Sequence, residues 1–121
     1  MNKSKALYNF WNSFGLTAYE ENNVPSGEDA PEFPYITYEL VTDSFGSAVA
    51  LTASLWYRSY SLAEINAKTE EISQAIGRGG CFLDGLWITR GTPFAQSMGD
   101  ENDAFIKRKN LNINVEFLSE N

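Results

Sequence analysis

The chain has 121 residues, of which 43% are hydrophobic, so we expect one folded domain with a single core over residues 1–121. Its 16 acidic and 9 basic residues give a formal net charge of −7, which disfavours a general nucleic-acid-binding role. A single cysteine and no histidine exclude an internal disulfide, a Cys/His zinc site and a nucleophile–histidine pair within one chain. We therefore expect no cofactor.

No apolar run approaches the roughly 20 residues that a membrane-spanning helix needs. The start, Met-Asn-Lys-Ser-Lys, leads into an amphipathic stretch and lacks the continuous apolar segment of a signal peptide. The sequence therefore predicts no membrane partner and a location in the cytoplasm or a virion.

The first predicted element is a helix that begins near Ser4 and ends at Gly15. Its apolar residues follow the i, i+3, i+4, i+7 spacing of one helical stripe. They are Leu7, Phe10, Trp11 and Phe14. Ser4 is a suitable N-cap and Gly15 a suitable C-terminal stop. Residues 16–19 are expected to continue as a short extended segment.

Residues 20–34 predict a long acidic loop, because prolines interrupt regular structure and no basic residue offsets the carboxylates. The acidic residues are Glu20, Glu21, Glu28, Asp29 and Glu32, and the prolines are Pro25, Pro31 and Pro34. A loop of this length is either a solvated connector or a functional arm.

Two strands, residues 35–41 and 48–57, are predicted to pair as a hairpin across a turn at residues 42–47. Alternate residues place one set of side chains in the core. These are Ile36, Tyr38 and Leu40 in the first strand, and Val49, Leu51, Ala53, Leu55 and Tyr57 in the second.

A second helix is predicted from the Ser61-Leu-Ala-Glu64 capping box to Gly77. In that motif Ser61 and Glu64 each accept a hydrogen bond from the other's backbone amide. The expected core stripe consists of Leu62, Ile65, Thr69, Ile72 and Ile76.

The C-terminal third predicts strands around turns. Residues 81–83 and 86–90 flank the Asp84-Gly85 turn, and residues 86–97 are largely extended, with interruptions at Gly91 and Pro93. After a tip loop at residues 99–103, the chain returns as a strand whose core residues are Leu111, Ile113, Val115 and Phe117. Lys107 and Lys109 share their parity, so this strand either bulges near Asn110 or begins beyond the core. The expected fold is α+β: an antiparallel sheet of about four strands with two helices, in the order α-β-β-α-β-β.

Carboxylates are the abundant reactive groups, and they predict no enzyme. The tip at residues 99–103 lacks the spacing of an EF-hand calcium loop. A metal-dependent nuclease built on Glu28 and Asp29 is the remaining catalytic reading, but catalytic carboxylates normally sit on rigid elements, and these lie on a proline-broken loop.

The second face of the predicted hairpin is unusually aromatic for a solvated surface. It carries Tyr35, Val41, Ala50 and Trp56, with Tyr8 off the helix stripe and Phe45 in the turn. Either loops fold back over these residues or a partner protein covers them, and we favour the partner.

Three stretches together resemble the small tail-terminator and tail-completion (head–tail joining) proteins of siphophages and prophages. They are Phe33-Pro-Tyr-Ile-Thr-Tyr38, Ala50-Leu-Thr-Ala-Ser-Leu-Trp-Tyr-Arg58 leading to Ser61-Leu-Ala-Glu-Ile65, and Gly91-Thr-Pro-Phe-Ala-Gln96. The similarity runs from the Leu7 helix to Phe117 and includes no catalytic signature.

The resemblance implies a virion protein that assembles in the bacterial host and forms a homo-hexameric ring. Its implied partners are the tail-tube protein and head–tail connector proteins, with DNA passing through the lumen without sequence-specific binding. We expect contacts at residues 42–47 and 95–105. The candidate interface residues are Tyr35, Phe45, Trp56, Phe94, Gln96, Met98 and Phe105. The alternative is a monomeric α+β module that binds a peptide or metabolite in an apolar pocket.

Overall fold

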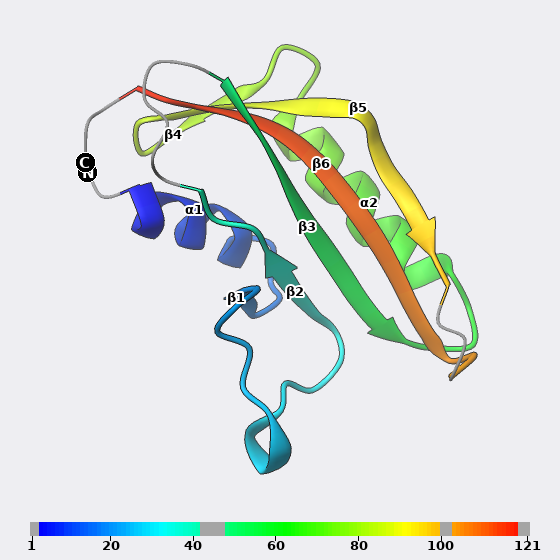
Figure 1. Cartoon of the computed structure of the whole chain (residues 1–121). Coiled ribbons are helices and arrows are strands. Elements are labelled where there is room, and N and C mark those ends of the chain that lie inside the picture. The colour runs from blue at the N-terminus through cyan, green and yellow to red at the C-terminus, as the bar shows by residue number, and fades with distance from the viewer. Residues whose placement is uncertain (1–2, 42–47, 100–102, 119–121) are drawn as a thin grey trace.

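The computed structural model of the chain describes residues 3–41, 48–99 and 103–118 as a twisted sheet with two helices (Figure 1). The helices are α1 (Lys3–Asn12) and α2 (Ala63–Ile76), and a short 3-10 turn, η1, covers Gly27–Asp29. The strands are β1 (Ala18–Glu20), β2 (Tyr35–Tyr38), β3 (Ala48–Arg58), β4 (Cys81–Leu83), β5 (Leu86–Met98) and β6 (Ile106–Phe117).

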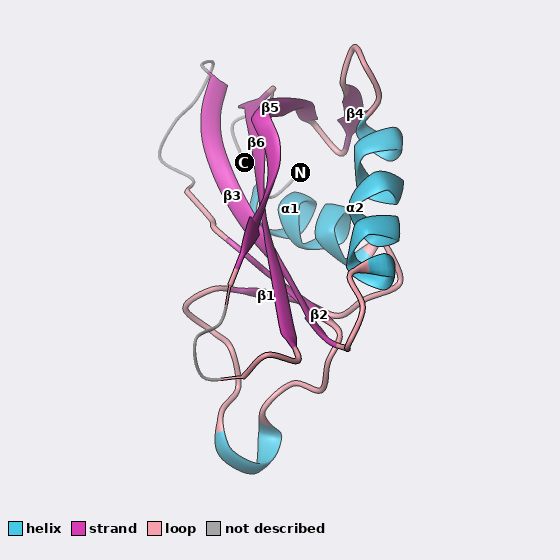
Figure 2. Ribbon diagram, turned by 90° about the vertical axis from the view of Figure 1, so that its right-hand side faces the viewer, coloured by secondary structure: helices cyan, strands magenta, loops and turns pink. Residues whose placement is uncertain are grey.

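The six strands form one mixed sheet in the order β1-β2-β3-β6-β5-β4. Both helices cover the same face, which leaves the other face without a helix (Figure 2). The α+β class and the antiparallel pairing of β2 with β3 are confirmed. The predicted strand number and the all-antiparallel pairing are wrong, because β1 runs parallel to β2 with Ala18 opposite Ile36. β1 and β4 have three residues each, too few for a period of two to stand out in the sequence.

The core lies between the helices and the sheet, where the predicted stripes meet. The four apolar residues of the first helical stripe are buried, as are Ile65, Thr69, Ile72 and Ile76 of α2 and the alternating residues of β6. Leu62 was expected in this core but is 47% exposed, because it precedes the first residue of α2. The Ser61 hydroxyl accepts a hydrogen bond from the Ala63 amide, as a cap does. The reciprocal capping-box bond is wrong, since the Ser61 amide donates to the Ser59 hydroxyl.

The irregularity predicted near Asn110 lies instead on the neighbouring strand. β6 pairs with β3 without interruption from Ala48–Glu116 to Arg58–Ile106. The register shift falls on β5 between Arg90 and Ala95. There the Asn112 side chain donates to the Pro93 carbonyl at 2.9 Å, and a Cβ at Gly91 would approach Asn112 to 2.8 Å. The start of β6, including Lys107 and Lys109, is half-buried at the margin of the core.

The outer edge of β1 is closed by a side chain. The Asn12 carboxamide accepts from the Ala18 amide at 2.9 Å and donates to the Ala18 carbonyl at 3.4 Å, as a neighbouring strand would. The next carbonyl along the edge, that of Glu20, accepts from the Asn23 amide at 2.8 Å. Because edge groups that are already paired do not recruit another chain, β1 is a poor template for strand addition.

Replacing Asn12 with alanine should therefore lower the free energy of unfolding by about 1–3 kcal/mol, the usual cost of leaving partly buried backbone groups unpaired. Urea unfolding followed by circular dichroism measures the change, with Asn66→Ala on the exposed side of α2 as the matched control. Equal unfolding midpoints for the two variants would contradict a stabilising role for Asn12.

Candidate protein-binding surface on the helix-free face

Four residues from four adjacent strands form one row across the helix-free face. Tyr35 lies opposite Trp56, Trp56 opposite Arg108, and Arg108 opposite Met98. Residues in direct cross-strand register share a face, and Ile36 and Leu55, which are adjacent in sequence to Tyr35 and Trp56, point into the core on the other side. We call this row, together with Tyr19 and Phe33, the aromatic patch.

Ring contacts hold the aromatic patch in a defined arrangement. The Tyr35 and Trp56 rings stack with centroids 6.0 Å apart and planes 11° apart, and the Arg108 guanidinium lies 4.6 Å from the Trp56 ring. Phe33 and Tyr19 pack on Tyr35 at 5.3 and 6.2 Å. Burial, and then the neighbouring Tyr19, raise the pKa of Tyr35, so its phenol is neutral at physiological pH. The patch is thus a preformed surface of aromatic rings around one cation.

The indole and the guanidinium are each fixed by a hydroxyl group. The Trp56 Nε1–H donates to Thr37 Oγ1 at 2.9 Å, and the Arg108 Nε–H donates to Ser54 Oγ at 3.2 Å. Ser54 is buried and in turn donates to Asn110 Oδ1 at 3.3 Å. Within the described residues Arg108 forms no ion pair, so its charge is available to an acidic group from outside the subunit.

The row next to the aromatic patch on the helix-free face is polar. It contains Thr37, Ser54, Asn110 and Gln96. At the opposite end of the sheet, the Phe82 and Trp87 rings are 4.5 Å apart, and Phe82 is 68% exposed. Aromatic side chains therefore gather at both ends of this face, with hydroxyl and amide groups between them.

The structure brings together four of the seven predicted interface residues. Tyr35, Trp56 and Met98 share the first row, and Gln96 lies in the second. Phe94 packs partly buried against the core at the bulge of β5. Phe45 lies outside the described residues, as does most of the tip at residues 99–103.

Sequence reasoning missed three members of the aromatic patch, Tyr19, Phe33 and Arg108. Arg108 lies in a run of three basic residues, Lys107-Arg108-Lys109. The signal that distinguishes it was its parity, since Lys107 and Lys109 match the core residues of β6 and Arg108 does not. Tyr19 joins the patch through the parallel pairing of β1 with β2, which no local pattern indicates.

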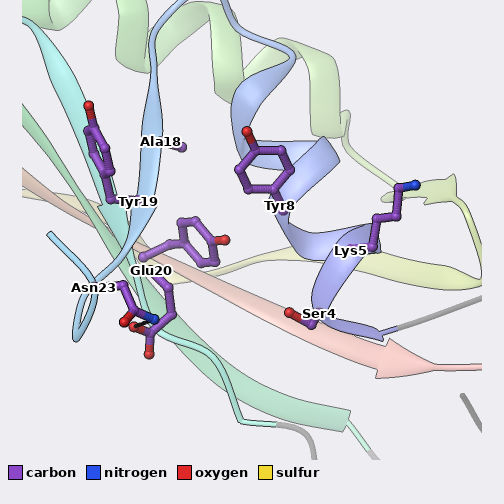
Figure 3. Close-up of a pocket in the computed structure, with 8 residues that line it drawn as sticks. Ser4, Lys5, Tyr8, Ala18, Tyr19, Glu20 and Asn23 are labelled. Atoms are coloured by element: carbon purple, nitrogen blue, oxygen red, sulfur yellow. Dashed lines mark hydrogen bonds between the residues drawn. The ribbon is translucent and has the colours of Figure 1, made fainter.

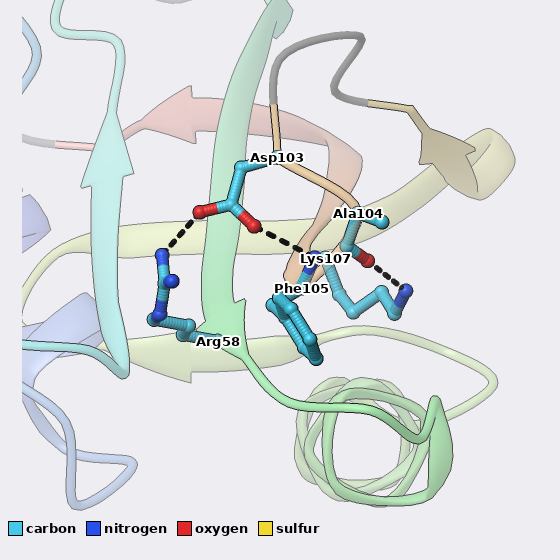
Figure 4. Close-up of polar contacts among 5 residues, drawn as sticks. All are labelled: Arg58, Asp103, Ala104, Phe105 and Lys107. Atoms are coloured by element: carbon cyan, nitrogen blue, oxygen red, sulfur yellow. Dashed lines mark hydrogen bonds and ion pairs between the residues drawn. The ribbon is translucent and has the colours of Figure 1, made fainter.

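Phe105, the seventh predicted residue, lies in a separate corner at the start of β6 (Figure 4). There Arg58 pairs with Asp103, and the Phe105 amide donates to the Asp103 carboxylate at 2.9 Å. This backbone hydrogen bond, followed by the Arg58 interactions, lowers the pKa of Asp103. The Phe105 ring packs edge-on against Tyr60, which is 88% exposed, with centroids 4.5 Å apart. The corner thus presents a second exposed aromatic pair beside Arg58.

A pocket of about 610 Å³ lies between α1 and β1 (Figure 3). It is lined by Ser4, Lys5, Tyr8, Ala18, Tyr19, Glu20, Asn23 and Tyr38. Tyr38 is buried, and burial, then Glu20 and Tyr8, raise its pKa. Its lining thus combines apolar surface with phenol, carboxylate, ammonium and amide groups.

The described residues offer no metal centre, because no group of three or more Cys, Asp and Glu side chains among them is placed to hold an ion. Glu28 and Asp29, the residues of the nuclease reading, are exposed on η1. Of the helices described, none has the length and apolar character needed to cross a membrane.

No protein-family model and no curated protein matches the chain. Among solved structures, the chain is similar to one chain of the virion of a native gene transfer agent particle, with a TM-score of 0.58 and 20% sequence identity. The likeness covers 92% of this chain and 90% of the other. It shows a shared fold over nearly the full length of both chains.

Proposed function

We propose that the chain is a structural subunit of a phage-like virion. The observation that carries this proposal is the near-complete overlap in fold with a chain of the gene transfer agent virion. The aromatic patch supports assembly with another protein, because a half-buried aromatic surface beside an arginine that forms no ion pair within the described residues is typical of a face that another protein covers. In this proposed role the chain works by assembling with other virion proteins and not by catalysis.

Within that role, we propose a ring at the head-proximal end of a tail, either terminating the tail tube or joining it to the head connector. The sequence resemblance to tail-terminator and tail-completion proteins supports this position. A ring of copies that each carry a net charge of −7 would let DNA pass through its lumen, since phosphate groups would meet like charge. The partners are then further copies of the chain, the tail-tube protein and the connector.

Negative-stain imaging of the purified chain, alone and mixed with tail tubes of the phage or prophage that encodes it, tests this function. We expect rings, or density confined to one end of each tube. The matched control is the same mixture with tubes already closed at both ends. A chain that stays monomeric and binds neither tubes nor connectors would refute the proposal.

A further inference from the structure

We propose that copies of the chain associate head to tail, with the acidic loop of one copy seated on the aromatic patch of the next. This inference deepens the proposed function by naming the contact between neighbouring subunits. We call residues 21–32 the acidic arm. The arm and the patch are different surfaces, so the contact is heterologous and continues from copy to copy until it closes.

The acidic arm stands away from the body of the domain. It leaves the sheet after β1 and returns at β2, and η1 forms its far end (Figures 1 and 2). All three residues of η1 are exposed, and a Cβ at Gly27 would meet nothing within 4 Å. The arm carries four carboxylates, and the sequence has no Lys or Arg from residue 6 to residue 57. The projecting segment is therefore uniformly negative.

The receiving surface has the opposite charge. Two of the nine basic residues, Arg58 and Arg108, lie on the helix-free face at the end of the sheet where β3 ends and β6 begins. Arg58 is paired with Asp103 but its side chain is 52% exposed, while Arg108 forms no ion pair within the described residues. Arg108 lies against the Trp56 ring, so an incoming carboxylate would meet a guanidinium that is already oriented.

The prolines of the arm fit the rings of the patch. Pro25 and Pro31 flank η1, and both are half-exposed. Proline-rich extended segments dock in aromatic-lined surfaces at low entropic cost, because their backbone is already restricted. The stacked Tyr35 and Trp56 rings, with Phe33 beside them, provide such a surface.

Charge reversal on each side of the contact tests the proposal. The arm variant is Glu28→Lys with Glu32→Lys, and the patch variant is Arg108→Glu. Sedimentation velocity at up to millimolar concentration should show each variant alone as a monomer under conditions where the native chain associates. A 1:1 mixture should form a complex of at least two chains. The native arm of the patch variant can bind the native patch of the arm variant.

The controls carry the same charge changes elsewhere: Glu64→Lys with Glu70→Lys on α2, and Arg78→Glu after it, all at exposed positions. They should associate as the native chain does. The arm–patch contact is overturned if the arm variant associates like the native chain, if the mixture stays monomeric, or if the native chain does not associate. Rings or tube binding that persist in both variants would leave the proposed function standing while removing this contact.

Discussion

Replacing Trp56 with alanine is expected to weaken association between copies of the chain by about thirtyfold or more. A central aromatic anchor in an interface typically contributes about 2 kcal/mol or more to binding. Trp56 fits that description because it stacks on Tyr35, carries the Arg108 guanidinium on its ring and is held by Thr37. Sedimentation velocity over a concentration series measures the change.

The same substitution should cost the fold much less, about 1–2 kcal/mol, because the indole is only half-buried and contributes one hydrogen bond and ring contacts. Trp87→Ala is the matched control, since Trp87 is also half-buried on the helix-free face but lies at the other end of the sheet. It should leave association unchanged. Equal losses of association and stability in Trp56→Ala would place this residue in the folding core of the subunit rather than in an interface.

Replacing Trp11 with alanine should destabilise the fold by about 3–5 kcal/mol, the range for removing a large buried aromatic side chain. Trp11 is 1% exposed, packs edge-on against Phe10 with ring centroids 4.8 Å apart, and stacks on Tyr38 with centroids 6.5 Å apart. It joins α1 to β2, and no nearby side chain is free to fill the cavity because its neighbours are themselves buried. Since small domains are stable by only about 5–15 kcal/mol, much of the margin would be lost.

Urea unfolding followed by circular dichroism measures this loss, and Tyr8→Ala provides the comparison on the same helix. Tyr8 is 50% exposed, so its removal should change the free energy of unfolding by less than about 1 kcal/mol. A small effect of Trp11→Ala, comparable to that of Tyr8→Ala, would mean that α1 does not contribute its stripe to the core.

The strongly periodic parts of the fold could be predicted from the sequence. The stripes of both helices and the alternation in β3 and β6 appear as predicted, because a core of apolar side chains imposes one period on each element. Leu62 lies outside the core because the capping motif does not determine where the residue before the first helical residue points. The segment that forms β4 was predicted from the Asp84-Gly85 turn beside it. The parallel pairing of β1 could not be predicted, since a three-residue strand owes its place to the strand beside it.

The candidate surface was predictable only in part, and for a physical reason. The alternation of side chains along a strand places Tyr35 and Trp56 on the face opposite the core. It does not show which residues of other strands lie beside them, because that depends on the order of the strands in the sheet. The long-range pairing of β3 with β6 places Arg108 beside Trp56, and the pairing of β6 with β5 places Met98 beside Arg108. Trp56 and Arg108 are about fifty positions apart in the chain, and no local pattern encodes their contact. Phe105 went to a different corner for the same reason.

The side chain of Asn12 affects how free copies of the chain can associate before assembly. In the role proposed above, the chain is made in many copies, which must not aggregate before they assemble. By occupying the outward-facing groups of Ala18, Asn12 removes one of the two ends from which this sheet could grow into a continuous intermolecular sheet. Copies of the chain therefore cannot add strands to one another without limit at the β1 edge. They meet instead through side-chain surfaces, and the geometry of those surfaces determines how many copies join.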